Sequence, residues 1–293
     1  MVAIWEQDFV GMSYFGFLAL FVGIPLLIAA ILNWQDVRNG KPMPGPLTSW
    51  GPYPVIGWLV VVAVVYTTPW DNYLVATRVW WYDPDLVTGI VFGWVPIEEY
   101  TFFVVQTLMT GLWTTWLLRR MPYGDLPKPD QSRRIRFIAT GIAGVIWLIS
   151  VILLVLSFTG GVWRQFTYLA LEVSWAFIPI MLQLIVGADI LWRHRYAVGI
   201  AILSTWLYLS GADALAIESG TWTINPEQSL PILIGGILPI EEAIFFLLTN
   251  VLVVFGLTLV IEHASEERIP VGIRSWLHRR KPEDRKLVPG AGD

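Results

Sequence analysis

The chain has 293 residues, of which 55% are hydrophobic and only 14% are charged, and its mean hydropathy is +0.60. Soluble domains carry roughly 25% charged residues, so this composition excludes an ordinary soluble domain and predicts an all-α integral membrane protein. The formal net charge of −4 is too small to indicate a nucleic-acid partner, and the absence of cysteine excludes disulfides, thiolate metal sites and a cysteine nucleophile.

Seven apolar segments are long enough to cross a membrane as helices. A hydrocarbon core of about 30 Å takes about 20 helical residues, whereas barrel strands are about half as long and alternate in polarity. Residues 1–11 carry Glu6 and Asp8 but no Lys or Arg, so we expect the first apolar segment to be retained and not to act as a secretory leader. In chain order the segments are 13–32, 53–69, 88–118, 135–158, 166–192, 196–211 and 231–261.

The basic residues predict the orientation of the helices. If the N-terminus lies outside, every Lys and Arg except Arg78 and Arg164 falls in a cytoplasmic loop or in the C-terminal segment. Cytoplasmic loops are enriched in basic residues, so the sequence predicts an outer N-terminus, a cytoplasmic C-terminus and a multi-pass protein of the cytoplasmic membrane.

An internal repeat divides the chain. The run Pro96-Ile97-Glu98-Glu99-Tyr100-Thr101-Phe102-Phe103 recurs at 239–246 and differs only at its fifth and sixth positions. Upstream, Asp71, Trp80 and Pro84 correspond to Asp213, Trp222 and Pro226. Equivalent helices are separated by four crossings, which predicts a parallel 3+1+3 arrangement around a pseudo-twofold axis along the membrane normal. The expected parts are a three-helix repeat (1–118), a basic loop with a linking helix (119–160), a second three-helix repeat (161–261) and a polar cytoplasmic tail (262–293).

Two pairs of adjacent glutamates are the candidate catalytic residues: Glu98 with Glu99, and Glu241 with Glu242. Burial and a neighbouring like charge both favour the protonated form of a carboxyl group, so we expect one member of each pair to be neutral. A neutral acid beside a carboxylate can perform acid/base chemistry without a cofactor. The alternative is that these residues only cap helices that begin behind the prolines, where acidic residues suit the helix dipole.

The residues near the glutamates supply further candidates. Aromatic rings one turn along the same helices either pack in the core or stabilise a cation. Aspartates at the ends of the second and sixth helices either face solvent or support the glutamates, and polar side chains deeper in the helices either bond to a carboxyl group or bridge helices. The full set is Asp71, Asp213, Phe102, Phe103, Phe245, Phe246, Trp80, Trp222, Gln106 and Asn250.

Several membrane chemistries are excluded by residues that the chain lacks. The seventh apolar segment has no lysine, which excludes a rhodopsin-type Schiff base, and the three histidines lie at 194, 263 and 278, which excludes intramembrane zinc proteolysis. The chain has no G-x-G-x-x-G fingerprint for a nicotinamide or flavin.

The motifs resemble those of the membrane-embedded lycopene cyclase family, with both of its repeats in one chain. The resemblance rests on Pro69-Trp70-Asp71-Asn72-Tyr73, Trp80-Trp81-Tyr82-Asp83-Pro84 and the two Pro-Ile-Glu-Glu runs, and it is strong over 66–118 and 208–261. At Ala212 the family often has a tryptophan, so the chain departs from the pattern there.

The resemblance implies a proton-initiated, non-redox cyclisation of the end groups of lycopene, with β-carotene as the expected product. It implies no cofactor and no metal, a substrate drawn from the membrane lipid, and an acid/base set made of the four glutamates with aromatic rings around the cation. It does not specify which glutamate is the acid, and it leaves open a homo-oligomer and an association with other enzymes of carotenoid synthesis.

Two alternatives belong to other classes. A proton-coupled transporter with 3+1+3 helices would place its glutamates on a water-accessible path. An intramembrane prenyltransferase would need an Asp-rich motif for magnesium diphosphate, and Asp83-Pro84-Asp85 is a poor match to one.

Overall fold

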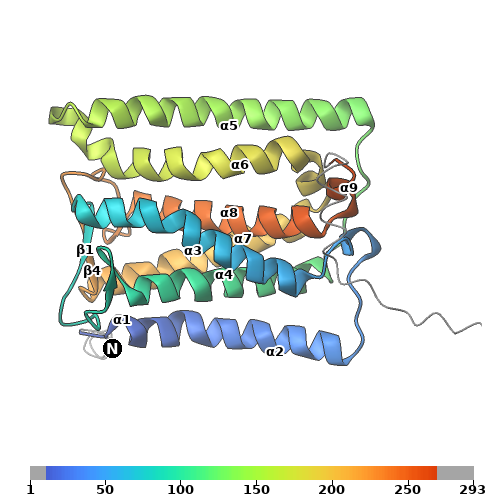
Figure 1. Cartoon of the computed structure of the whole chain (residues 1–293), viewed down its shortest axis with the longest axis horizontal. Helices are drawn as coiled ribbons and strands as arrows, with labels where there is room; N and C mark the ends of the chain where they lie inside the picture. Colours follow the sequence, from blue (N-terminus) through green and yellow to red (C-terminus); the bar gives the residue numbers. More distant parts are fainter. Residues whose placement is uncertain (1–10, 269–293) are drawn as a thin grey trace, which may run out of the picture.

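The computed structural model describes residues 11–268, and their long helices lie side by side in one bundle (Figure 1). The expectation of a retained N-terminal segment rests mainly on residues 1–10, and most of the expected polar tail is 269–293. Both segments lie outside the described residues. Within 11–268, seven helices are long and apolar enough to cross a membrane, which confirms the predicted number of long apolar helices.

The spans follow one another with short connections. The first consists of α1 (Tyr14–Phe17), a π-helical segment η1 (Leu18–Gly23) and α2 (Ile24–Arg38), and the second is α3 (Pro52–Ala76) after a short turn η2 (Gly45–Leu47). The others are α4 (Ile97–Leu118), α5 (Pro129–Ser157), α6 (Thr167–Arg193) with a preceding 3₁₀ segment η3 (Gly161–Phe166), α7 (Arg195–Glu218) and α8 (Ile240–Ile261). A last short helix, α9 (His263–Glu266), follows.

The predicted helical segments 88–118 and 231–261 are wrong in their first residues. Residues 88–96 contain strands β2 (Val91–Phe92) and β3 (Val95–Pro96), and the later segment contains β5 (Leu233–Ile234) and β6 (Leu238–Pro239). Both hairpins turn through glycines with positive φ, such as Gly93 at 71°, a conformation that other residues rarely adopt. At Gly93 an added Cβ would also lie 2.1 Å from Asn72 Oδ1.

A third strand pair joins distant parts of the chain. Strand β1 (Trp80–Tyr82) follows α3, strand β4 (Trp222–Ile224) follows α7, and the two pair antiparallel. Trp80 pairs with Ile224 and Tyr82 with Trp222. This ribbon lies at the same end of the bundle as the start of α1 (Figure 1).

Helices α4 and α8 form the centre of the bundle. In each, 61% of the most apolar stretch is buried, against at most 39% in the other spans. Polar side chains join the two helices: Thr110 donates a hydrogen bond to Asn250 (2.7 Å), and Gln106 donates one to Thr249 (3.2 Å). Lateral contacts of this kind hold helices together in lipid, where the hydrophobic effect does not.

Ion pairs tie the helices together at the opposite end. Asp36 of α2 accepts two bonds from Arg120 (2.7 and 2.6 Å), and Asp189 of α6 accepts bonds from Arg268 (2.8 and 2.6 Å). His194 is bonded to Glu262 (2.6 Å). The first residues of the expected tail, 262–268, are therefore bound to this end of the bundle.

Candidate functional site

The two Glu-Glu pairs lie in the first turns of α4 and α8, directly behind Pro96 and Pro239. Their side chains point in different directions. Glu98 Oε1 accepts the backbone N–H of Thr88 (2.6 Å), and Glu241 Oε1 accepts that of Leu230 (2.6 Å). Each of these acids therefore holds the loop in front of its own helix, while the other member of each pair faces the bundle.

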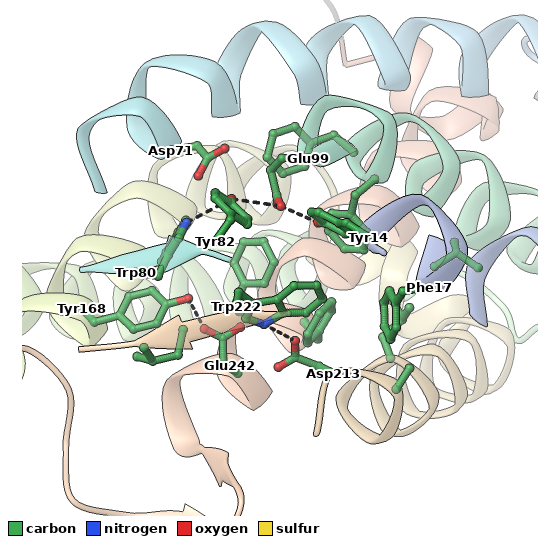
Figure 2. A pocket seen from close by; sticks show the side chains of 18 of the residues that line it. Tyr14, Phe17, Asp71, Trp80, Tyr82, Glu99, Tyr168, Asp213, Trp222 and Glu242 are labelled. Carbon is green, nitrogen blue, oxygen red and sulfur yellow. Dashed lines mark hydrogen bonds between the residues drawn. The ribbon is translucent and has the colours of Figure 1, made fainter. Parts of the chain in front are cut away.

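Glu99 from the first half and Glu242 from the second half line one cavity. This cavity lies between the strand ribbon and the helices (Figure 2). Asp71 and Asp213 also reach it, so four acids from four helices line one small space. The rest of the wall is mostly aromatic. It is made of Tyr14, Phe17, Val22, Trp70, Trp80, Tyr82, Phe102, Phe103, Tyr168, Leu209, Ala212, Trp222, Ile224, Phe245 and Phe246.

Two phenols bind the carboxylate of Glu99. Tyr14 donates to Glu99 Oε2 at 2.5 Å and Tyr82 donates to the same oxygen at 3.1 Å, while Trp80 Nε1 donates to the Tyr82 hydroxyl at 3.1 Å (Figure 2). Burial and the neighbouring Glu99 raise the pKa of Tyr82 well above its usual value of 10.0. Tyr82 therefore keeps its proton and remains a hydrogen-bond donor.

The acid centre of the other half is built differently. Tyr168 donates to Glu242 Oε1 at 2.7 Å, and Trp222 Nε1 donates to Asp213 Oδ1 at 3.1 Å (Figure 2). Asp213 and Glu242 are within hydrogen-bonding reach of each other. Two carboxyl groups can bond only if one of them carries a proton. The strand residue equivalent to Tyr82 is Ile224, which has no hydroxyl group to donate.

Most of the other predicted residues surround these acids. All four predicted phenylalanines and both tryptophans line the cavity, and Phe102 meets Phe246 edge to face at 6.0 Å. Gln106 and Asn250 do not line it. They bridge α4 and α8 one to two turns further along the bundle, the simpler of the two roles expected for them.

The profile of the lycopene cyclase family matches residues 49–117 and 165–260, which contain all four cavity acids. The chain is 37% identical to a lycopene beta-cyclase of Halobacterium salinarum over 250 residues, 84% of this chain and 95% of that protein. The chain belongs to the lycopene cyclase family.

Fungal members of the lycopene cyclase family are larger proteins. The chain is 35% identical over 216 residues to a bifunctional lycopene cyclase/phytoene synthase of Podospora anserina, and 38% identical over 212 residues to one of Gibberella fujikuroi. These matches cover 72% and 68% of this chain but only 35% and 33% of the fungal proteins. No solved structure matches the chain.

Sequence reasoning missed the three tyrosines that bind the glutamates. Tyr82 lies in the Trp-Trp-Tyr-Asp-Pro run already noted, whereas Tyr14 and Tyr168 open helices that carry no family motif. A polar ring in the first turn of an otherwise apolar span was the available signal.

Glu172 was also missed. It is fully buried one turn after Tyr168 in α6, and neither of its oxygens has a hydrogen-bond donor among residues 11–268. It does not line the cavity, and it interacts electrostatically with Glu242 and Glu241.

Proposed function

We propose that this protein is a lycopene cyclase that converts lycopene to β-carotene by acid/base chemistry at the four-acid cavity. One observation supports this most directly: Glu99 and Glu242, from the two Pro-Ile-Glu-Glu runs, line one aromatic cavity, and both side chains are buried. Each glutamate has an aspartate beside it, Asp71 with Glu99 and Asp213 with Glu242.

The reaction needs only a proton to enter and a proton to leave. An acid adds a proton to the terminal double bond of lycopene, which produces a tertiary cation. The next double bond attacks that cation and closes a six-membered ring, and a base removes a proton to give the ring alkene. The substrate and product are isomers, and the acid is restored when the proton is returned through the carboxyl groups.

Hydrogen bonding supports different roles for the two glutamates. Glu99 accepts two phenol hydrogen bonds, and donors of this kind favour the ionised form of a carboxyl group. It is suited to stabilise the cation and to accept the proton. Glu242 and Asp213 lie close enough to share one proton, so this pair is suited to deliver the proton that starts the reaction.

The aromatic wall suits a cationic intermediate. Phe102, Phe103, Phe245 and Phe246 bring their rings to the cavity between the two acid centres. Ring faces attract a positive charge most strongly where water is absent. A dry cavity also prevents water from capturing the cation before the base removes a proton.

The arrangement in the membrane is part of the proposal. The strand ribbon and both acid centres lie at the end of the bundle opposite the arginine-rich ion pairs, so we place the acids near the outer face of the cytoplasmic membrane. The repeat pairs α3–α4 with α7–α8. In the β1–β4 ribbon, Trp80 pairs with Ile224, and their equivalents Trp222 and Tyr82 pair with each other. A twofold axis requires such reciprocal pairing.

Expression in bacterial cells that accumulate lycopene tests the proposed function. Pigment extraction and chromatography should show conversion of lycopene to β-carotene in cells where an immunoblot finds the chain in the membrane fraction. Unchanged lycopene beside a membrane-inserted chain would overturn the proposal. A product with an ε ring would overturn only the assignment of the product.

A further inference from the structure

A second cavity adjoins the acid cavity further along the bundle. Phe103 and Phe245 line both cavities. Gln106 and Thr107 of α4 lie about two helical turns, or about 11 Å, beyond Glu99 and form part of the second wall. The second cavity measures about 160 Å³ against about 50 Å³ for the acid cavity. Val62, Ala63 and Tyr66 of α3 and Trp175 of α6 also line it.

The second cavity reaches the lipid-facing surface between α3 and α6. Val62, Tyr66 and Trp175 line both this cavity and a groove on the outer face of α3. Val61 and Val65 extend the groove, and their side chains are 50% and 68% exposed on a surface that faces the bilayer. The groove, the second cavity and the acid cavity therefore adjoin one another through shared wall residues, in a row from the lipid-facing surface to the acids.

Four nearly parallel rings follow this route. Tyr66 stacks on Trp175 (5.2 Å, 22°), Trp175 stacks on Trp70 (4.7 Å, 19°), and Trp70 stacks on Phe245 (5.8 Å, 4°). Phe245 then belongs to the wall of the acid cavity. The ring stack starts at the groove and ends beside Glu242.

The polar atoms of the ring stack are bonded to backbone of the facing helix. Tyr66 donates to the carbonyl of Trp175 (2.9 Å), and Trp175 Nε1 donates to the carbonyl of Tyr66 (3.4 Å). Trp70 Nε1 donates to the carbonyl of Leu171 (3.2 Å). The polar atoms of the rings are therefore already bonded, which leaves the stack apolar toward whatever lies along the route.

We propose that the second cavity binds the conjugated polyene chain of the substrate, which enters from the bilayer between α3 and α6 with one end group directed to the acids. This inference rests on the proposed function. A C40 substrate whose end group fills the acid cavity leaves most of its length outside that cavity, and the rest must lie in an apolar space joined to it. A planar conjugated chain suits a path bordered by stacked rings.

The other half of the bundle provides a matched control. There Tyr208 donates to the carbonyl of Phe21 (2.9 Å), as Tyr66 does to that of Trp175, but Ala212 occupies the place of Trp70. The equivalent groove is lined by Pro25, Ile28, Ala29, Met109, Trp113, Ser204, Thr205 and Tyr208, and none of these residues also lines the acid cavity. Thr205 is the counterpart of Ala63.

Because the chain has no cysteine, single cysteines can report on the two grooves. The variants Ala63→Cys and Thr205→Cys are labelled with N-ethylmaleimide in membranes from lycopene-accumulating cells and from pigment-free cells. We expect the carotenoids of the pigmented membranes, lycopene and the β-carotene formed from it, to slow the labelling of Ala63→Cys about tenfold, because a bound ligand buries most of the pocket that holds it, and to leave Thr205→Cys unchanged.

Three results would overturn the polyene site: equal labelling of Ala63→Cys in both membranes, equal slowing of both variants, or no labelling of Ala63→Cys in pigment-free membranes. The pigments of the same cultures separate this inference from the proposed function. If lycopene is cyclised while Ala63→Cys stays unprotected, only the polyene site fails. If the unsubstituted chain cyclises no lycopene, the proposed function fails first.

Discussion

Adjacent glutamates in this chain differ in what they touch. Glu99 and Glu242 line the cavity, while Glu98 and Glu241 accept backbone N–H groups of the loops before their helices. Two adjacent positions in the sequence thus place one side chain at the cavity and the other against a loop. We therefore propose that the two readings of the pairs, capping and catalysis, are divided between their members.

Replacing the cavity glutamates should be far more harmful than replacing their neighbours. We expect Glu99→Gln and Glu242→Gln each to lower cyclase activity about 100-fold or more, because a carboxamide neither donates an acidic proton nor accepts one. Glu98→Gln and Glu241→Gln keep an amide oxygen for the backbone N–H and should retain most activity. Pigment analysis at equal membrane expression measures both. Equal losses in all four variants would contradict this division of roles.

The phenols should affect activity through Glu99. Tyr82→Phe removes a donor to the carboxylate, and a hydrogen bond to a charged group contributes about 1.5–3 kcal/mol, so activity should fall at least tenfold. Because the raised pKa of Tyr82 keeps its phenol protonated above pH 10, the activity ratio of parent to Tyr82→Phe should stay constant from neutral pH to pH 10. Assays in detergent–lipid micelles across this range measure the ratio. If the ratio decreases as the pH rises toward 10, the phenol of Tyr82 ionises in this range and the prediction is wrong.

At the scale of elements, hydropathy predicted the number of helices but not where two of them begin. Residues 88–96 and 231–239 are apolar enough to read as helix, yet Gly93, Gly235 and the prolines turn them into hairpins. These two segments carry large apolar side chains, so their composition resembles that of a membrane span. In the structure some of these side chains lie on the surface, such as Trp94, which is 67% exposed. The glutamates therefore lie in the first turns of their helices and not in the middle of the spans.

The repeat predicted that the two glutamate pairs would lie opposite each other, and one member of each pair, Glu99 and Glu242, lines the shared cavity. It could not predict Tyr14 and Tyr168, because side chains of helices outside the matched motifs find their partners only through tertiary packing. The division between Glu98 and Glu99 likewise depends on how each side chain leaves the first turn, which spacing alone does not give.

Close packing of α3 on α4 depends on a glycine. A Cβ at Gly111 would lie 2.8 Å from Ile56 Cγ1, whereas one at Gly57, next to Ile56, would meet nothing within 4 Å. We expect Gly111→Ala to destabilise the protein by about 1–3 kcal/mol through overpacking. Gly57→Ala should be neutral or slightly stabilising, because alanine is the better helix former. Thermal unfolding in detergent compares them, and a Gly111→Ala variant as stable as the parent would show that α3 and α4 tolerate a wider spacing.

At the scale of the whole molecule, two halves meet at one site without being identical. The ribbon of β1 and β4 joins them, and each half supplies an Asp and a Glu to the cavity, with two tyrosines from the first half and one from the second. Single differences between equivalent positions, such as Tyr82 and Ile224, or Trp70 and Ala212, give the halves different hydrogen bonds and different walls. Such differences are what the proposed mechanism requires, in which one acid centre gives a proton and the other receives it.

The proposed orientation makes a direct prediction about the loops. If the halves run parallel, the loop after α3 and the loop after α7 lie on the same side of the membrane, opposite the loop between α4 and α5. With no native cysteine to interfere, Asp85→Cys and Glu227→Cys should both react with a membrane-impermeant maleimide in intact cells. Asp125→Cys should react only after the membrane is permeabilised, since the basic residues around it favour the cytoplasm. If only one of Asp85→Cys and Glu227→Cys reacts in intact cells, the parallel repeat is ruled out. If neither reacts while Asp125→Cys does, the protein has the opposite orientation in the membrane.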